Sequence, residues 1–225
     1  MENKSALIVG ATGLVGRQIL KVLLENDYYN QITIVSRRSV GIEDHRVKEI
    51  VIEFDNFDQY KDQISANDYY CSVGTTMKKA GSKEAFMKVD YSIPLLLAKH
   101  AKQDPTFEQF LLVSSYGANT DSALYYNQVK GKTEQDLISL KLKSLLIFQP
   151  SLLLGDRDEF RFFEEVAKFI SAIFSFFIIG THLRLWAIKA TDVAKAMFTI
   201  AKRKEAQGVK IYKPLQMIRA ANPKK

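Results

Sequence analysis

Short apolar runs alternate with longer amphipathic patterns along this chain of 225 residues. Residues spaced three and four apart, as at Leu14, Val15, Ile19, Val22 and Leu23, predict helices with one apolar face. The apolar and β-branched runs that predict strands are residues 6–9, 31–35, 47–54, 68–73, 110–113, 143–150 and 208–212. Strands that alternate with helices throughout predict a doubly wound α/β fold with a parallel sheet, the Rossmann fold. We expect residues 1–225 to form a single domain, with substrate-side elements within 151–190 as a small carboxyl-terminal extension.

Capping residues and a proline predict where two helices begin and bend. Ser82 is placed to cap a helix that runs toward Lys102. Pro94 lies inside that helix and predicts a kink, because proline lacks the N–H that the preceding turn needs. Thr191 is expected to cap a later helix.

The longest apolar segment, residues 169–180, is shorter than the roughly 20 residues that span a bilayer, so no transmembrane helix is expected. Residues 169–179 are best explained as a buried helix, because a helix that is apolar all round belongs in a core. A lid over a substrate, a dimer face and a contact with a membrane surface are the alternatives, and a homodimer is a candidate assembly. Arg184 and Trp186 follow this segment as candidates for the pocket mouth.

Composition and charge narrow the classes of function. The formal charge of +7 is interpreted as lysine scattered over a solvated surface, because no stripe of basic and aromatic residues typical of nucleic-acid binding stands out. Such a surface favours anionic cofactors and substrates. The one cysteine, Cys71, excludes an intrachain disulfide and a cysteine-built metal site, and no metal site is expected. Residues 1–4 lead directly into the first strand without a signal peptide, so we expect a cytoplasmic location.

A glycine-rich turn, Gly10-Ala-Thr-Gly13-Leu-Val-Gly16, follows the first predicted strand. Strand, tight turn and helix in this order are the fingerprint of a dinucleotide site. Gly10 allows the turn, Gly13 lets a pyrophosphate approach the backbone, and Gly16 lets the helix pack closely on its strand. The helix N-terminus offers free N–H groups and positive dipole to the phosphates. A packing turn without a ligand is the alternative.

Ser36, Arg37 and Arg38 end the second predicted strand. An NAD site has an acidic residue here, about 20 positions past the glycine motif, whereas an NADP site has arginine nearby. Two arginines and a serine suit a 2′-phosphate that a carboxylate would repel, so NADP(H) is favoured over NAD(H). Surface arginines without a ligand are the alternative.

Further polar residues stand at the carboxyl ends of later strands, the edge where open α/β sheets bind ligands. Asp55 is placed either to hydrogen-bond an adenine or to cap the next helix. Residues 74–76, Gly-Thr-Thr, allow a ligand to approach the backbone and offer hydroxyl donors. The fifth strand ends in Ser114 and Ser115.

The glycine motif at 10–16, Ser115, and the pair Tyr126 and Lys130 one helical turn apart together resemble the short-chain dehydrogenase/reductase superfamily. The finer resemblance is to its atypical branch, which includes the Tat-interacting oxidoreductase-like proteins and their bacterial relatives. It extends over nearly the whole chain through residues 36–38, 74–76, 80–82, 89–91, 113–115, 126–131, 150–155, 157–159 and 192–194.

The resemblance implies an NADP(H)-dependent oxidoreductase for a small carbonyl or alcohol, with Ser115, Tyr126 and Lys130 as catalytic residues. The tyrosine of the superfamily is the general acid toward a carbonyl oxygen. Its ordinary pKa of about 10 calls for a nearby cation, which Lys130 supplies, while Ser115 orients the substrate oxygen. The residues assigned to the cofactor are Gly10, Thr12, Gly13, Leu14, Val15, Ser36, Arg37, Arg38, Asp55, Gly74, Thr75, Thr76, Tyr126, Lys130 and Pro150.

Two departures from the superfamily leave alternatives open. The gap between Ser115 and Tyr126 is shorter than in typical members, so Ser114 is a second candidate for the serine role. Little of the chain follows Gly155 to build a substrate domain. The alternative function is a regulatory or scaffold protein that binds NADP(H) without turnover, and the sequence names no substrate.

Overall fold

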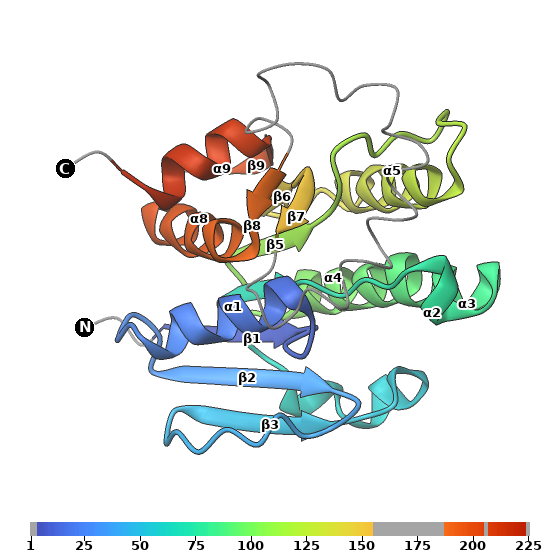
Figure 1. Ribbon diagram of the computed structural model, residues 1–225. Coiled ribbons are helices and arrows are strands. Elements are labelled where there is room, and N and C mark those ends of the chain that lie inside the picture. Colours follow the sequence, from blue (N-terminus) through green and yellow to red (C-terminus); the bar gives the residue numbers. More distant parts are fainter. Residues whose placement is uncertain (1–3, 155–186, 205–206, 224–225) are drawn as a thin grey trace.

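The computed structural model describes residues 4–154, 187–204 and 207–223, and within them seven strands form one parallel sheet (Figure 1). The strand order is β3-β2-β1-β4-β5-β6-β9, and each neighbouring pair is parallel. The strands are β1 (Ser5–Val9), β2 (Gln31–Ser36), β3 (Val47–Val51), β4 (Asp68–Cys71), β5 (Gln109–Val113), β6 (Ser144–Phe148) and β9 (Gly208–Tyr212). The order reverses between β1 and β4, which creates the crevice where such sheets bind ligands. The predicted Rossmann fold is confirmed.

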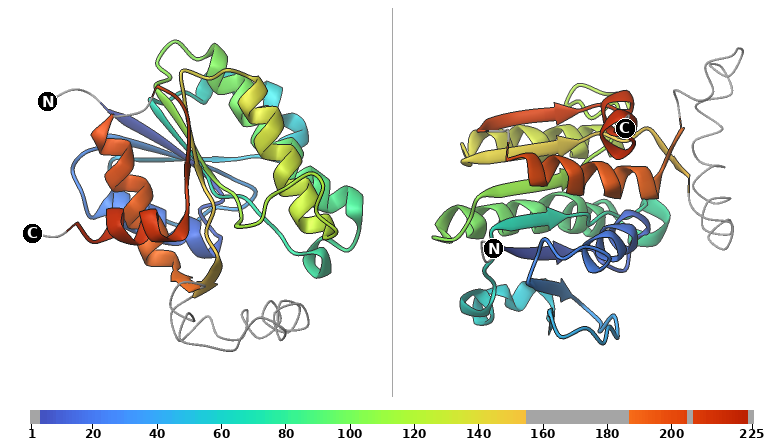
Figure 2. Two further views of the ribbon diagram at one scale, coloured as in Figure 1. Left: turned by 90° about the horizontal axis from the view of Figure 1, so that it is seen from above. Right: turned by 90° about the vertical axis from the view of Figure 1, so that its left-hand side faces the viewer.

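Helices cover both faces of the sheet (Figure 2). One face packs on α1, α8 and α9, and the other packs on α4 and α5. The α-helices are α1 (Leu14–Leu24), α2 (Met77–Ala80), α3 (Lys83–Met87), α4 (Ile93–Gln103), α5 (Tyr125–Ser139), α8 (Ala190–Arg203) and α9 (Pro214–Ala221). Shorter helical turns are η1 (Phe54–Gln59), η2 (Lys61–Gln63) and the π-helix η3 (Lys88–Ser92).

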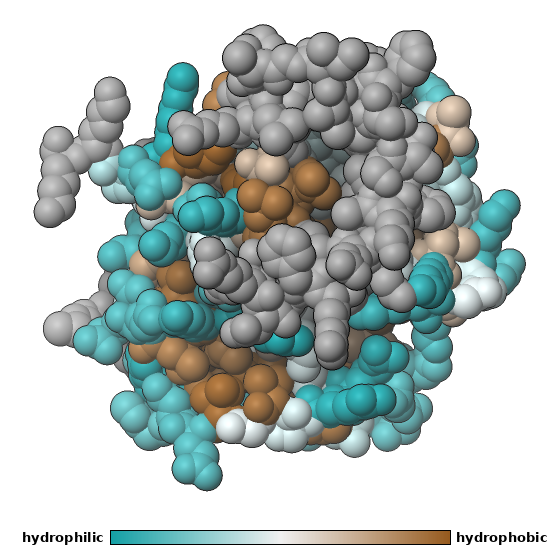
Figure 3. Space-filling view, viewed as in Figure 1, coloured by the Kyte–Doolittle hydropathy of each residue, from teal (hydrophilic) through white to brown (hydrophobic). Residues whose placement is uncertain are grey.

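The surface positions of the flanking helices are hydrophilic. Arg17 and Lys21 are exposed on α1, and Lys195 and Lys202 are exposed on α8. The apolar positions of both helices lie in one core cluster with residues of the central strands. Figure 3 shows the result on one face of the molecule, where hydrophilic side chains surround smaller apolar areas. The amphipathic pattern that predicts these helices therefore also determines which side meets the sheet.

The predicted irregularity at Pro94 falls one turn earlier than the proline. The π-helix η3 separates α3 from α4, and Pro94 lies in the first turn of α4. Because Pro94 has no N–H, the carbonyl of Asp90, four residues before it, has no helical donor from that position. The Thr133 hydroxyl on α5 lies 2.9 Å from this carbonyl oxygen and 2.8 Å from the Val129 carbonyl oxygen, so its one proton is shared between these two acceptors. The missing hydrogen bond thus becomes a link between the two helices.

The carboxyl-terminal part differs from the sequence-based expectation in three details. Lys189, rather than Thr191, is the N-cap of α8, so the helix begins at Ala190. Helix α9 follows β9 where no helix is predicted. A two-stranded parallel sheet joins β7 (Leu152–Leu154) to β8 (Ala187–Lys189), a pairing between residues too far apart in sequence for a local pattern to predict. The expectations for residues 160–179, Arg184 and Trp186 lie outside the described residues.

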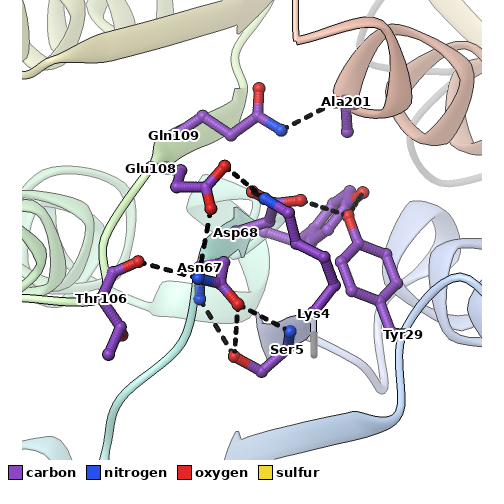
Figure 4. Close-up of polar contacts among 10 residues, drawn as sticks. Lys4, Ser5, Tyr29, Asn67, Asp68, Thr106, Glu108, Gln109 and Ala201 are labelled. Atoms are coloured by element: carbon purple, nitrogen blue, oxygen red, sulfur yellow. Dashed lines mark hydrogen bonds and ion pairs between the residues drawn. The ribbon is translucent and has the colours of Figure 1, made fainter. Parts of the chain in front are cut away.

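A buried polar cluster closes the amino-terminal edge of the sheet (Figure 4). The Lys4 ammonium lies 3.9 Å from Asp68 Oδ1 and donates a hydrogen bond to Glu108, and the Tyr29 hydroxyl donates to Asp68 Oδ2 at 2.5 Å. The side chains of Lys4 and Asp68 are 4% and 0% exposed. Burial raises the pKa of Asp68 to about 6, although the Tyr29 hydrogen bond and the Lys4 charge act in the opposite direction.

Two simpler features complete the fold. Cys71 is fully buried in β4, and burial raises the pKa of its thiol to about 12, as fits an inert thiol. Of the helices in the described residues, none combines the length and apolarity needed to cross a bilayer.

Candidate functional site

The glycine turn between β1 and α1 has the geometry that its sequence predicts. Gly10 has φ of +92°, and a Cβ there would lie 2.7 Å from the Ser72 carbonyl carbon at the end of β4. A Cβ at Gly16 would overlap the Gly10 carbonyl. Gly13 is less confined, because a Cβ there would come no nearer than 3.2 Å to the Gly10 oxygen. Gly10 and Gly16 are thus required by backbone packing, whereas packing alone does not require a glycine at Gly13.

The N-terminus of α1 suits an anion. Its N-cap is Gly13, which has no side chain to accept from the first N–H groups, and its first turn contains no acidic residue. Leu14 and Val15 are the first residues of the helix, and the Thr12 carbonyl accepts from Arg17 Nε at 3.0 Å. A helix that begins this way leaves its N–H groups and positive dipole available to a phosphate.

A buried ion pair lies across the crevice from this turn. Lys130 on α5 lies with its ammonium 2.7 Å from Asp90 Oδ1, and the two side chains are 6% and 0% exposed. The other oxygen of Asp90 accepts from the Thr75 N–H at 2.8 Å. A Cβ at Gly74 would lie 3.4 Å from the Asp90 carboxylate and 3.8 Å from the Lys130 ammonium. The ion pair therefore lies directly beneath the loop that ends β4.

Lys130 also lies near the candidate acid. Its ammonium is 6.0 Å from the centroid of the Tyr126 ring, which packs on Phe86 of α3 at 5.9 Å. Burial acts to lower the pKa of Lys130, but the adjacent Asp90 carboxylate outweighs it, so the pKa lies above its ordinary value. Lys130 is consequently charged over the whole neutral range, and Tyr126 is half-buried next to it.

Asp90 belongs to residues 89–91, which carry part of the family resemblance, but the sequence assigns it no role in the candidate site. It falls in a helical pattern forty residues before Lys130, where an acidic residue normally belongs to a solvated surface. Pro94, four residues later, is the one local signal, because it predicts that the helix is irregular around Asp90. Burial inside a π-helix is typical of functional positions.

The two serines at the end of β5 differ in environment. Ser114 is buried, and its hydroxyl donates to Glu134 on α5. Ser115 is half-buried, and its hydroxyl makes a weak bond to the Tyr116 carbonyl at 3.3 Å. The Ser114 hydroxyl is therefore occupied within the protein, whereas the Ser115 hydroxyl makes only this weak bond. The Tyr116 N–H donates to the Pro150 carbonyl at 2.8 Å, so Pro150 acts on this loop through its backbone.

The remaining predicted cofactor residues lie at the ends of β2, β3 and β4. Arg37 and Arg38 are exposed, and the Ser36 hydroxyl donates to the Arg38 carbonyl at 2.6 Å, which shapes the turn that carries them. Asp55 is in the first turn of η1 but is not its N-cap, which is Glu53, and it accepts from Lys88 at 2.6 Å. The capping alternative for Asp55 is therefore wrong. The Thr76 hydroxyl caps α2 by accepting from the Lys79 N–H at 3.2 Å.

The chemistry of this edge is that of positioned protons and charges. In the part of the chain that the structure describes, no group of three His, Cys, Asp or Glu side chains is arranged to hold a metal ion. What the edge does provide is an open helix N-terminus, a buried cation under Gly74, a half-buried phenol and a half-buried hydroxyl.

Sequence comparison agrees with this geometry. A model described as the NAD dependent epimerase/dehydratase family matches residues 6–136. Protein HTATIP2 of Rattus norvegicus is 34% identical over 202 residues, which cover 88% of this chain and 81% of the rat protein. Protein FMP52, mitochondrial, of Debaryomyces hansenii is 37% identical over 212 residues, which cover 91% of this chain and 90% of that protein. The resemblance inferred from the motifs is confirmed.

These relatives correct the expected location. The Debaryomyces protein is named as mitochondrial, and so is Protein FMP52-1 of Scheffersomyces stipitis, which is 40% identical over 159 residues, 68% of this chain and 69% of its own. The cytoplasmic expectation is therefore wrong. Its argument was the lack of a signal peptide, which concerns secretion and does not separate the cytosol from the mitochondrion.

Solved structures share the fold at low sequence identity. A short chain dehydrogenase family protein from Francisella tularensis superposes with a TM-score of 0.69 at 12% identity, covering 95% of this chain and 98% of its own. The enzyme WbmF of Bordetella bronchiseptica in complex with NAD+ gives 0.68 at 14% identity, covering 98% and 78%. A nicotinamide cofactor is thus supported for the fold, with NAD in the second of these structures.

Proposed function

This chain belongs to the NAD-dependent epimerase/dehydratase family, and we propose that it is an NADP(H)-dependent oxidoreductase that acts on a small carbonyl or alcohol. The main observation in support is that the open N-terminus of α1 and the Tyr126–Lys130 face of α5 lie at one edge of the sheet, on either side of Gly74. One element suits the phosphates of a dinucleotide, and the other suits a proton transfer.

The residues present fit the cofactor. Gly13 and the first turn of α1 would hold the pyrophosphate, Arg37 and Arg38 the 2′-phosphate, and Gly74 and Lys130 the middle of the molecule. The exposed arginine pair is the reason for preferring NADP(H) to NAD(H). When bound, the cofactor supplies or accepts a hydride.

The protein's own part is to manage a proton. Tyr126 would donate its phenolic proton to the carbonyl oxygen during reduction and remove a proton from the alcohol during oxidation. The nearby Lys130 charge would stabilise the negative charge that develops on the phenolic oxygen during this transfer. Ser115 would orient the substrate oxygen by a hydrogen bond.

The experiment combines binding and turnover. Purified protein is titrated with NADPH and then mixed with NADPH and a panel of aldehydes and ketones, beside Tyr126→Phe. We expect the wild-type protein to consume NADPH with at least one carbonyl and the variant to bind NADPH but not to consume it. Undiminished turnover in Tyr126→Phe would remove the proposed acid.

One observation favours the alternative of a regulatory protein that binds NADP(H) without turnover. The Asp90 carboxylate lies 2.7 Å from Lys130 and neutralises much of the charge that would act on Tyr126. Tight binding of NADPH without consumption with any carbonyl would favour this alternative.

A further inference from the structure

A line of polar side chains joins the carboxyl-terminal segment to the end of β5. The Lys213 ammonium donates to Gln149 Oε1. Gln149 Nε2 donates to both carboxylate oxygens of Glu134 at 2.8 Å each, and the Ser114 hydroxyl donates to one of them. Gln149, Glu134 and Ser114 are buried, at 4%, 7% and 5% exposure. Four separate segments of the polypeptide thus meet in one hydrogen-bonded network, formed by Lys213, Gln149, Glu134 and Ser114.

The charged groups of this network, the Lys213 ammonium and the Glu134 carboxylate, fix the direction of every hydrogen bond in it. An ammonium only donates, so the Gln149 amide must turn its oxygen toward Lys213 and its NH2 toward Glu134. An ionised carboxylate only accepts, so the Ser114 hydroxyl must point its proton at Glu134. The proton of the Ser114 hydroxyl is therefore unavailable to any group outside this network.

The same network is connected to the backbone around Ser115 by hydrogen bonds and by a contact with the Tyr116 ring. The Ser114 N–H donates to the Phe148 carbonyl at 2.7 Å, and the Tyr116 N–H donates to the Pro150 carbonyl at 2.8 Å. The Lys213 ammonium also lies 5.4 Å from the centroid of the Tyr116 ring. The backbone on both sides of Ser115 is thus held by Gln149's neighbours in sequence and by the cation that orients Gln149.

We propose that Glu134, Gln149 and Lys213 are positioning residues for the candidate active site, which fix Ser114 inward and thereby present Ser115 as the serine that meets the substrate. This inference rests on the proposed oxidoreductase function. Glu134 lies one helical turn after Lys130 on α5, so the same helix face holds the cation under Gly74 and the carboxylate that anchors residues 114–116, the serine loop. Lys213, in the carboxyl-terminal segment, acts on the site through this network and does not itself contact the substrate.

The polar neighbours of Glu134 favour the ionised carboxylate that this arrangement needs, whereas burial opposes it. Burial raises the pKa of Glu134 above its ordinary value, while the hydrogen bonds from Ser114 and Gln149 and the charges of Lys213 and Lys130 act to lower it. A neutral Glu134 would carry a proton that must itself be donated, which would reverse the hydrogen bond with Ser114.

The test compares Glu134→Gln and Lys213→Met with Asp136→Asn as the matched control. Asp136 lies on the same helix and accepts from Tyr91 at 2.8 Å and Lys132 at 3.0 Å, but it has no contact with the serine loop. We expect kcat/KM for the carbonyl to fall about 10- to 100-fold in the first two variants, with NADPH affinity within about twofold of wild type. The double variant Glu134→Gln, Lys213→Met should have a kcat/KM no lower than that of the poorer single variant, because both substitutions disrupt the same network. Asp136→Asn should behave as wild type.

Two further measurements make the proposal falsifiable. Ser114→Ala breaks the same hydrogen bond as Glu134→Gln and should lose a similar share of activity, whereas Ser115→Ala should lose more, and the reverse ranking of the two serines would overturn the assignment. Amide hydrogen exchange at Tyr116 reports the loop without turnover, and we expect it to speed up about tenfold in Glu134→Gln and Lys213→Met only. Unchanged exchange at Tyr116 in both variants overturns the positioning role. A wild-type protein that reduces no carbonyl overturns the proposed function, and the exchange rate then still tests whether the network holds the serine loop.

Discussion

Two buried lysine–aspartate pairs lie within the described residues, one at the amino edge and one at the carboxyl edge of the sheet. At the amino edge, Lys4 lies 3.9 Å from Asp68 and shares its charge with Glu108. At the carboxyl edge, Lys130 lies 2.7 Å from Asp90. Both aspartate side chains are fully buried, so each pair needs its partner to offset the loss of water.

The surroundings of the two pairs decide what they can do. The Asp68 side chain is enclosed by large groups, because the Tyr29 and Tyr70 hydroxyls lie 2.9 Å apart beside it and are themselves buried. The Lys130–Asp90 pair lies next to Gly74, where a Cβ would come 3.4 Å from the Asp90 carboxylate and 3.8 Å from the Lys130 ammonium. The same chemical pair thus has two tyrosine side chains beside it at one edge and a residue without a side chain beside it at the other. The neighbouring residues, more than the charges, distinguish the two pairs.

The largest expected effect comes from removing each pair as a unit. Removing a lysine alone leaves a buried carboxylate unpaired, at a cost of about 3–5 kcal/mol, so each change is paired with Asp→Asn. We expect Lys130→Met with Asp90→Asn to fold and to lose about 100-fold or more in NADPH turnover. Lys4→Met with Asp68→Asn should fold and keep turnover within about twofold. Urea unfolding and NADPH consumption measure the two effects, and equal loss of turnover in both double variants would refute the contrast.

A second effect concerns the pH dependence of stability at the amino edge. Asp68 holds its proton more tightly in the folded protein, where its pKa is about 6, than in the unfolded chain, where it is about 4. Folding therefore takes up a proton between these values, and the free energy of unfolding falls as the pH rises through them, by up to about 3 kcal/mol from this group. Asp68→Asn should lose this slope.

Other carboxylates act in the opposite direction, since Asp104 and Glu49 have lowered pKa values. The measurement is therefore the difference between wild type and Asp68→Asn in urea unfolding from pH 4 to 8. A difference that does not change with pH would mean that Asp68 is ionised throughout this range.

The smallest effect contrasts two arginines from the same edges. Arg37 is exposed at the carboxyl end of β2, whereas Arg46, just before β3, donates to the Leu24 carbonyl at 2.7 Å and the Asn26 carbonyl at 2.9 Å. Arg37→Ala should weaken NADPH binding about 10- to 100-fold, leave NADH binding nearly unchanged and leave stability unaffected. Arg46→Ala should cost about 1–3 kcal/mol of stability without a preference between cofactors. Equal loss of NADPH and NADH binding in Arg37→Ala would mean that this arginine does not contact the 2′-phosphate.

The sequence predicts those parts of the molecule that depend on neighbours along the chain. The glycine turn, the strand positions and the cap at Ser82, which accepts from the Ala85 N–H at 3.1 Å, each follow from a few adjacent residues. The reversal of strand order also follows, because alternating strands and helices have few other ways to pack.

Contacts between distant residues remained out of reach. Asp90 meets Lys130 only because η3 turns it inward and α5 packs beside it. Glu134, Gln149 and Lys213 come from three parts of the chain, and each one alone resembles an ordinary polar residue. The choice between Ser114 and Ser115 depends on the hydrogen-bonded network of these three residues, so a local sequence pattern could not distinguish the two serines. The catalytic roles of Ser115, Tyr126 and Lys130 stay predictions.

The place of β9 at the edge of the sheet has a consequence for synthesis of the protein. Strands β1 to β4, which frame the glycine turn, are complete once Cys71 has left the ribosome. Strand β6 pairs with β9 on its outer side, so its edge stays open until residues 208–212 emerge. Lys213 follows immediately after them. A nascent or truncated chain that stops before β9 would therefore contain the glycine turn but lack Lys213, the cation that orients Gln149.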